Sequence, residues 1–302
     1  MPFPALEVIR KVAGEPLPEL PDGSPNIAMG IRPIKEFVKP YWLASEPDVS
    51  VSLGAGVKAR LQYAIDSQGH FDWAALMGTF SNGPVMLYLF DANSNRFLSN
   101  KPVHSTTICG SGQRYFRLPC PYFFNVGDSQ REFQIFAENA VPGVGTTVVS
   151  IVPFGRRFYH KEMPPQMAAE ILRDYDCIMK EYPYLLVPED YDFRGVPPVL
   201  AANAKTQFEF EMDDSADLEC SKLLFASTGA FTFTLREKDK DRLLMADLVH
   251  SSEGWGNAEF PVYLMDSFLL QRKRQLIMEI TDLSGAPNYI FATIAGIRSQ
   301  YR

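Results

Sequence analysis

The sequence predicts an all-β protein made of two tandem, duplicated antiparallel β-sandwich domains of the jelly-roll type. Three observations support this fold class. One half of the chain repeats the other, apolar and polar residues alternate inside each copy, and no helical period occurs within a copy. A proline-rich N-terminal arm and one connecting helix are expected outside the copies.

The duplication is an ungapped match of residues 81–124 with residues 227–270, at a constant offset of 146 residues. Chance does not explain such a run with its apolar positions in phase. The identical pairs are Ser81/Ser227, Gly83/Gly229, Leu89/Leu235, Arg96/Arg242, Leu98/Leu244, Val103/Val249, His104/His250, Ser105/Ser251, Gly110/Gly256 and Leu118/Leu264.

The strand signals in each copy are strong. Residues 231–236 (FTFTLR) alternate throughout, and residues 85–90 keep the same inward positions. A short polar turn follows in both copies, at 93–95 and 239–241, which is typical of a hairpin. Further strands recur every ten to fifteen residues. We therefore expect a β-sandwich at residues 49–158 and a second at 206–302.

The N-terminal arm, residues 1–48, carries nine of the 23 prolines and should be extended rather than form a domain. It also holds many large apolar residues, so we expect it to lie on a surface. Two surfaces stay open: its own first copy, or a neighbouring subunit.

The linker at residues 159–205 is expected to contain a helix at about 165–182. Its apolar stripe runs from Met167 to Tyr182, Pro164 and Pro165 begin it, and Pro183 ends it. The stripe is expected to bridge the two sandwiches, with binding of a partner as the alternative. Residues 185–202 should wrap as an ordered loop.

Composition excludes several classes of function. The net charge is −7, which argues against nucleic-acid binding, and no apolar run approaches the roughly 18 residues that span a bilayer. The N-terminus shows no signal-peptide pattern. Cysteines 109, 120, 177 and 220 show neither CxxC spacing nor pairing between the copies, which predicts a reducing cytoplasm and no shared zinc site.

The search for chemistry yields no catalytic, cofactor-binding or metal-ligating residue. His104 and His250, each in Val-His-Ser, are the most suggestive pair, but neither copy has the HxH pattern of a cupin-type metal site. We interpret them as histidines that close a buried turn. The shared Gly110 and Gly256 predict a turn with positive φ. No nucleophile motif is present, so we expect no enzyme and no cofactor, although a carboxylate pair of the glycosidase kind cannot be seen in sequence.

Aromatic residues make up 13% of the chain. Most are expected to fill the two cores. The alternative is a carbohydrate-binding or host-receptor-binding surface, which predicts exposed rings in the loops around Trp255 or Tyr115.

The order of features within each copy resembles the small β-domain structural proteins of tailed-bacteriophage virions, found as head-decorating, vertex, neck or collar components. Each copy has a Ser-x-Gly turn, an alternating strand, a polar hairpin, a glycine turn and a final strand with Gly-x-Arg, at 155–157 and 296–298. The resemblance covers roughly two thirds of the chain. It implies a non-enzymatic subunit, located in the virion, whose partners are capsid, portal or neck proteins and further copies of itself.

The duplication has a geometric consequence. A trimer of a two-domain chain presents six similar domains and suits a site of quasi-six-fold symmetry. We therefore expect a symmetric homo-oligomer.

Overall fold

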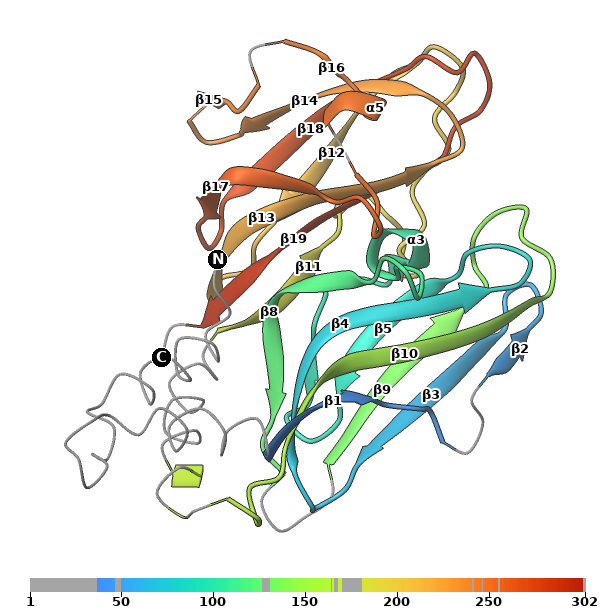
Figure 1. Cartoon of the computed structure of the whole chain (residues 1–302). Coiled ribbons are helices and arrows are strands. Elements are labelled where there is room, and N and C mark those ends of the chain that lie inside the picture. The colour runs from blue at the N-terminus through green and yellow to red at the C-terminus, as the bar shows by residue number, and fades with distance from the viewer. Residues whose placement is uncertain are drawn as a thin grey trace.

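The fold consists of two jelly-roll sandwiches that lie side by side (Figure 1). The computed structural model describes residues 37–46, 50–126, 131–163, 165, 168–169, 181–240, 242–245, 247–254 and 256–300. The strands of the first copy are β1 (Val38–Trp42), β2 (Val51–Leu53), β3 (Lys58–Ile65), β4 (His70–Phe80), β5 (Met86–Asp91), β6 (Arg96–Phe97), β7 (Val103–His104), β8 (Phe116–Phe124), β9 (Arg131–Glu138) and β10 (Thr147–Phe158).

The second copy repeats this order. Its strands are β11 (Glu181–Leu186), β12 (Lys205–Glu211), β13 (Ala216–Ser227), β14 (Phe231–Glu237), β15 (Arg242–Leu243), β16 (Val249–His250), β17 (Val262–Leu270), β18 (Gln275–Asp282) and β19 (Ile290–Gln300). Two four-residue helical turns, α3 (Ser105–Ile108) and α5 (Ser251–Gly254), follow the Val-His pair of each copy.

The sheet orders are equivalent in the two copies. In copy one, β1-β10-β4-β8 faces β3-β9-β5-β6, and in copy two β11-β19-β13-β17 faces β12-β18-β14-β15. All of these pairs are antiparallel. The expected all-β fold of two tandem sandwiches is confirmed, and the strand order is that of a jelly roll.

Each copy takes its edge strand from outside the boundaries that the repeat suggested. β1 comes from the N-terminal arm and pairs with β10, while β11 comes from the linker and pairs with β19. The helix expected to end at Tyr182 is therefore wrong at that end, because Glu181–Leu186 is a strand. Pro183 lies within it, which an edge strand tolerates because the missing N–H faces away from the sheet. Residues 1–36, and most of the rest of the expected helix, lie outside the described residues.

The Gly-x-Arg ends of the final strands are structural. Arg157 stacks over the ring of Tyr41, 4.7 Å from its centroid, and Arg298 stacks over Tyr184 at 4.5 Å. Both arginines are buried, and each forms an ion pair with an aspartate in a connection between the two sheets: Arg157 with Asp66, between β3 and β4, and Arg298 with Asp213, between β12 and β13. Each copy thus fastens its edge strand with the same cation–π contact.

The shared glycines do not adopt the positive φ that the sequence suggested. Gly110 and Gly256 are instead sites of close backbone approach, bridged to Met77 and Leu224 respectively. A Cβ atom would lie 2.0 Å from the Arg114 carbonyl oxygen at Gly110, and 1.9 Å from the Phe260 carbonyl oxygen at Gly256. Only glycine fits, for steric reasons rather than torsional ones.

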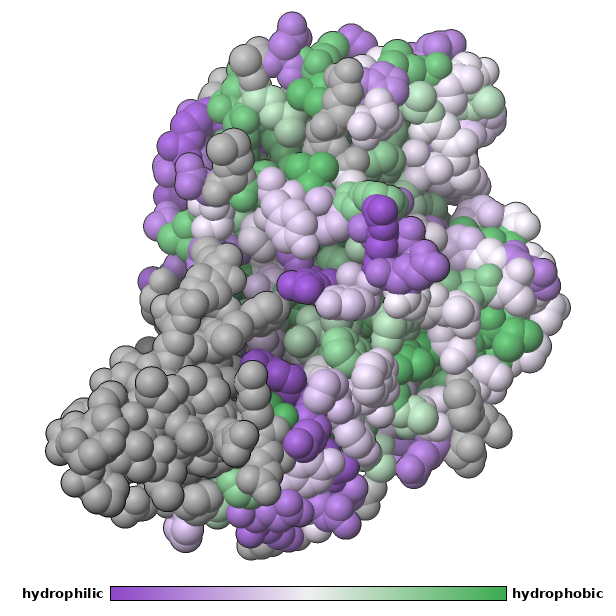
Figure 2. Space-filling model, in the orientation of Figure 1, coloured by the Kyte–Doolittle hydropathy of each residue, from purple (hydrophilic) through white to green (hydrophobic). Residues whose placement is uncertain are grey.

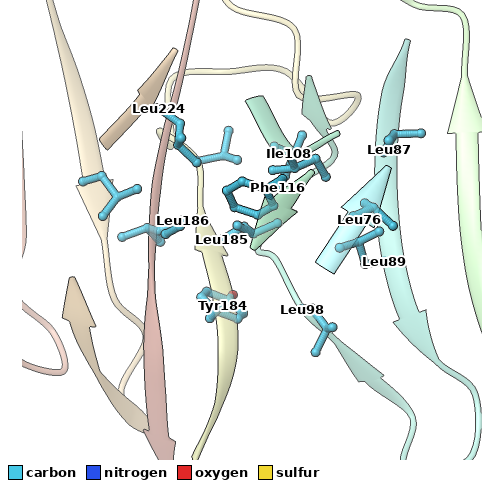
Figure 3. Packing of buried hydrophobic residues seen from close by; sticks show 14 of the residues in the cluster. Leu76, Leu87, Leu89, Leu98, Ile108, Phe116, Tyr184, Leu185, Leu186 and Leu224 are labelled. Carbon is cyan, nitrogen blue, oxygen red and sulfur yellow. The ribbon is translucent and has the colours of Figure 1, made fainter. Parts of the chain in front are cut away.

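One hydrophobic core runs through both copies. Trp73, Tyr63 and Phe133 are fully buried in the first sandwich, and Phe208 and Phe231 in the second. Figure 3 shows the region where the copies meet, in which the labelled residues come from both copies. They include Ile108, Phe116, Leu185, Leu186 and Leu224. Burial of apolar side chains across the junction favours a fixed relative position of the two copies.

Replacing Gly256 with alanine is expected to lower the free energy of unfolding by about 1–3 kcal/mol, because the new methyl group overlaps a backbone oxygen. Urea denaturation measures this. Gly112→Ala is the matched control, since an added Cβ there meets no atom within 4 Å. Equal stability of the two variants would contradict the steric explanation.

Candidate functional site

Each shared histidine forms a hydrogen bond within its turn, but the buried turn expected from the sequence is found only at His104. His104 Nδ1 lies 2.9 Å from Thr106 Oγ1, and His250 Nδ1 lies 2.8 Å from Ser252 Oγ. The two rings differ in burial. His104 is covered by Phe291 of the second copy, with ring centroids 4.2 Å apart, whereas His250 is only half-buried. Burial lowers the pKa of His104 to about 3.

The serine that follows each histidine explains why Val-His-Ser is shared. Ser105 Oγ accepts a hydrogen bond from the Val85 backbone N–H at 3.1 Å, and Ser251 Oγ accepts one from Phe231 at 3.4 Å. Each serine thereby satisfies a buried donor at the start of a core strand. The Val-His-Ser motif therefore has a structural role in both copies.

Metal binding and thiolate reactivity both depend on the side-chain groups that the described residues bring together. No group of three His, Cys, Asp or Glu side chains is placed there to hold a metal ion. Cys109, Cys120 and Cys220 are buried, and burial raises the pKa of each thiol, which disfavours a reactive thiolate. No helix among the described residues is long and apolar enough to span a membrane.

A hollow lies on the outer face of the sheet β1-β10-β4-β8 in copy one. This groove has a volume of about 290 Å³. Its lining residues come from all four strands and from the loop before β8: Pro40, Ala74, Ala75, Tyr115, Arg117, Phe154, Gly155 and Arg156.

A β-bulge creates the groove. Phe154 pairs with Ala75 and Gly155 with Trp73, so Ala74 is an extra residue in β4. The small side chains at the bulge leave space at the surface. Gly155 is required there, because a Cβ atom would lie 1.9 Å from the Asp72 carbonyl oxygen.

Aromatic rings and guanidinium groups surround the groove. Phe154 packs against Trp42 and Tyr115, with ring centroids 5.0 and 5.7 Å away. Arg156 is anchored by an ion pair with the fully buried Asp72, and Arg117 donates a hydrogen bond to the Tyr115 hydroxyl at 3.1 Å. This combination suits a ligand with flat apolar faces and negative charge, or an apolar and acidic protein surface. The same face is turned toward the viewer in Figure 2, where hydrophobic and hydrophilic residues alternate on it without one uniform patch.

A second hollow, of about 260 Å³, lies at the junction of the copies and is lined in part by Asn100, Tyr184, Glu189, Asp213 and Arg298. Its charged groups already have partners, since Arg298 pairs with Asp213 and Glu189 with Lys101. This hollow therefore belongs to the structural junction.

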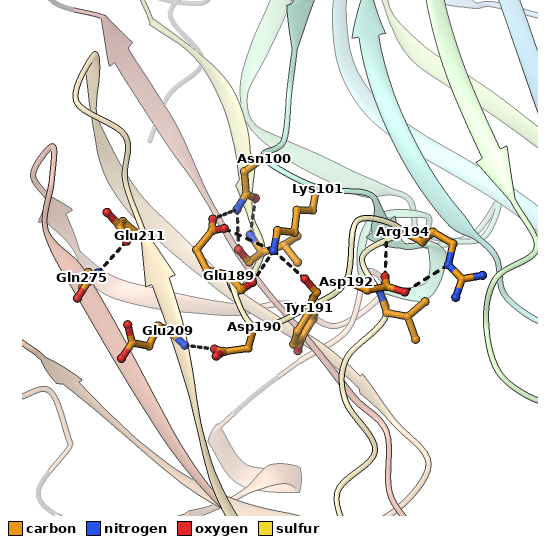
Figure 4. Close-up of polar contacts among 12 residues, drawn as sticks. Asn100, Lys101, Glu189, Asp190, Tyr191, Asp192, Arg194, Glu209, Glu211 and Gln275 are labelled. Carbon is orange, nitrogen blue, oxygen red and sulfur yellow. Dashed lines mark hydrogen bonds and ion pairs between the residues drawn. The ribbon is translucent and has the colours of Figure 1, made fainter.

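Beside that hollow, hydrogen bonds of Asn100 and Lys101 join the linker to the first copy (Figure 4). We call this set of contacts the polar seam. The Asn100 amide pairs with the backbone of Val187 in both directions, at 2.7 and 2.8 Å. The Lys101 ammonium donates to the Tyr191 carbonyl at 2.7 Å and lies 3.4 Å from the Glu189 carboxylate. These contacts align the segment after β11 with the loop after β6.

Lys222 is the one strongly shifted lysine among the described residues, and it also lies at the junction. Burial, with a smaller contribution from Arg117, lowers its pKa to about 8. Its ammonium donates to the Arg117 carbonyl and lies between the rings of Phe116 and Tyr263, at 4.9 and 5.2 Å from their centroids. With these contacts made, the side chain joins β13 of copy two to β8 of copy one.

Exposed rings are expected from the sequence in the loops around Trp255 or Tyr115, and Phe260, in the loop after Trp255, is 57% exposed. Tyr115 lines the groove and is half-buried, while Trp255 lies outside the described residues. Sequence reasoning missed Trp42 and Phe154. A signal for Trp42 was present: Pro-Tyr-Trp at 40–42 corresponds to Pro-Tyr-Leu at 183–185.

No protein-family model and no curated protein matches this sequence. Among solved structures, a likeness extends over 84% of this chain and 96% of PNGase F, a glycosylasparaginase from Flavobacterium meningosepticum, at 8% identity and a TM-score of 0.34. A subviral particle of infectious bursal disease virus VP2 matches over 87% of this chain and 72% of its own, at 10% identity and a TM-score of 0.22. The lectin of Pleurotus ostreatus matches over 86% and 81%, at 11% identity and a TM-score of 0.21.

The expectation that the chain is not an enzyme is corrected by these findings, because the similar solved structures include amidases. They also include a viral capsid protein, a lectin and a tandem carbohydrate-binding module. Likenesses of this size assign no residue or substrate to this chain.

His104→Gln is expected to reduce the loss of stability in acid. The unfolded chain binds a proton at this residue below pH 6.5, whereas the folded chain binds it only near pH 3, so the free energy of unfolding falls as pH drops through this range. One such proton contributes about 1.4 kcal/mol per pH unit. Urea denaturation between pH 6.5 and 4.5 should therefore give a shallower slope for the variant. The half-buried His250→Gln is the control, and an unchanged slope in His104→Gln would contradict the argument.

Proposed function

We propose that this chain is a structural subunit of a virus particle, of the tailed-phage kind, which assembles as a symmetric homo-oligomer on or next to the capsid. Jelly rolls are used widely in viral capsid and lectin domains. The observation that carries the proposal is the close packing of two equivalent jelly rolls, joined by a continuous core and by the seam at Asn100 and Lys101.

A fixed pair of equivalent domains suits a ring whose quasi-symmetry has a higher order than its number of subunits. Three chains supply six similar domains, and each chain contributes two related surfaces to the ring. The net charge of −7 favours protein neighbours over a phosphate backbone. We infer that the partners are further copies of the chain together with capsid, portal or neck proteins.

A second candidate function is carbohydrate or host-receptor binding in the groove of copy one. The observation that favours it is the cluster of Trp42, Tyr115 and Phe154 beside two arginines, since aromatic faces and charged side chains are common in sites that orient polar ligands. The two functions predict different outcomes in the measurements below.

The purified chain is expected to form a discrete oligomer at micromolar concentration and to co-sediment with particles that contain it. Mass photometry and sedimentation velocity measure the first property, and particle fractionation the second. A chain that stays monomeric and never associates with particles would rule out the structural role.

Retention on a glycan array, lost in Tyr115→Ala and kept in Phe193→Ala, would support the second function instead. Phe193 is a suitable control because it is an exposed aromatic residue outside the groove.

A further inference from the structure

Inside the chain, one edge of copy one packs on the outer face of the sheet β11-β19-β13-β17 of copy two. The Leu185 backbone N–H donates to the Leu98 carbonyl at 2.9 Å, which adds the loop after β6 alongside β11. Phe291 covers His104, and Lys222 reaches the Arg117 carbonyl. We call the two sides of this contact the covered edge and the covered face.

Because the copies are equivalent, the chain carries each of these surfaces a second time. The free face is the outer side of β1-β10-β4-β8 with its groove. Trp42 stands there in the position of Leu185, since the preceding residues Tyr41 and Tyr184 each pair with the glycine of Gly-x-Arg. The free edge is formed by β15, β16, α5 and β17 of copy two, where Leu244 stands in the position of Leu98.

Both the free edge and the free face expose large apolar side chains. On the free edge, Leu243, Leu248 and Leu269 are each more than half exposed. On the free face Trp42 is 58% exposed. The residues that meet at the contact already formed, Phe116 and Leu185, are fully buried. Exposed apolar surface of this kind marks interaction sites.

Charged groups line both free surfaces. The free edge carries exposed Asp247 and Asp266, together with Arg242, which pairs with Glu237. The groove of the free face carries Arg117 and Arg156, and Arg156 pairs with Asp72. At the contact inside the chain, Lys101 of the covered edge pairs with Glu189 of the segment beside the covered face, and Lys222 of the covered face donates to the Arg117 carbonyl. The exposed aspartates of the free edge can in the same way meet the exposed Arg117 of the free face.

We propose that the free edge of copy two packs on the free face of copy one in a second copy of this chain. This inference rests on the proposed function and names the surface through which its subunits meet. The loop at Leu244–Leu248 lies along β1 beside Trp42, and apolar side chains of the edge fill the groove. The contact joins unlike surfaces, so its repetition builds a closed ring when the rotation closes.

Two charge insertions test the contact. Trp42→Glu and Leu248→Glu are each expected to weaken self-association at least about 30-fold, because a charge then replaces an apolar anchor at the centre of the interface. Leu283→Glu is the matched control, since Leu283 is also an exposed leucine of copy two but lies in the turn after β18. Sedimentation velocity gives the dissociation constants, and circular dichroism shows that each variant is folded.

Cross-linking tests the register independently of stability. Leu185 and Ser99 form a backbone bridge inside the chain, and the equivalent residues are Trp42 and Met245. With a short bismaleimide, the double variant Trp42→Cys/Met245→Cys should give a covalent ladder that ends at the ring. An equimolar mixture of the two single variants should stop at covalent dimers.

The outcomes separate this inference from the proposed function. A wild-type oligomer that is insensitive to both charge insertions and gives no ladder overturns the inference and leaves the structural role standing. A wild-type chain that is monomeric and absent from particles overturns both. Glycan retention that is lost in Trp42→Glu, with the molecular mass unchanged, shows that the free face is a glycan site and also overturns the inference.

Discussion

The packing of one edge of the first jelly roll on the outer face of the second is the interaction on which the rest of the structure depends. It buries Phe116 and Leu224 in a core shared by both copies, encloses Lys222 and covers His104. Without it, an apolar sheet face and an edge strand would both be open to solvent. The contact therefore converts two separate sandwiches into one rigid body with a defined pair of outer surfaces.

Local backbone geometry makes this packing possible. In each copy, a bulge in β4 or β13 lies opposite the glycine of Gly-x-Arg, and the shared glycine before β8 or β17 lets a loop approach the sheet closely. These features bring the loop and the edge strand to the same side of the sandwich. The shared glycines are required by contacts between backbones, so a duplicated chain retains them although the surfaces around them have diverged.

The sequence was sufficient for the fold class because the ungapped repeat and the strand alternation are local signals. It was insufficient for the edge strands. Pro40 and Pro183 were read as breakers, although an edge strand has one side on which the missing N–H has no consequence. Gly110 was assigned positive φ because a linear pattern cannot show the Arg114 carbonyl oxygen that lies against it in space. Among the residues that line the groove, Tyr115 could be predicted from the sequence as a ring in a loop. Phe154 could not, because it lies on a strand and the sequence does not show which face of that strand points outward.

The divergence of the two copies follows from their unequal surroundings. Phe291 and Lys222 of copy two lie on the covered face, and both are buried against copy one. In copy one, Ala75 stands in the position of Lys222, and the small residues around it leave the groove open. A face that is always covered inside its own chain can evolve to fit one permanent neighbour. The equivalent face of copy one exposes Trp42 beside two arginines. Exposed apolar surface of this kind marks an interaction site. Equivalent positions of the two faces differ in exposure: Leu185 is buried on the covered face, whereas Trp42 is exposed on the free face. This difference, more than any single residue, indicates binding at the free face of copy one.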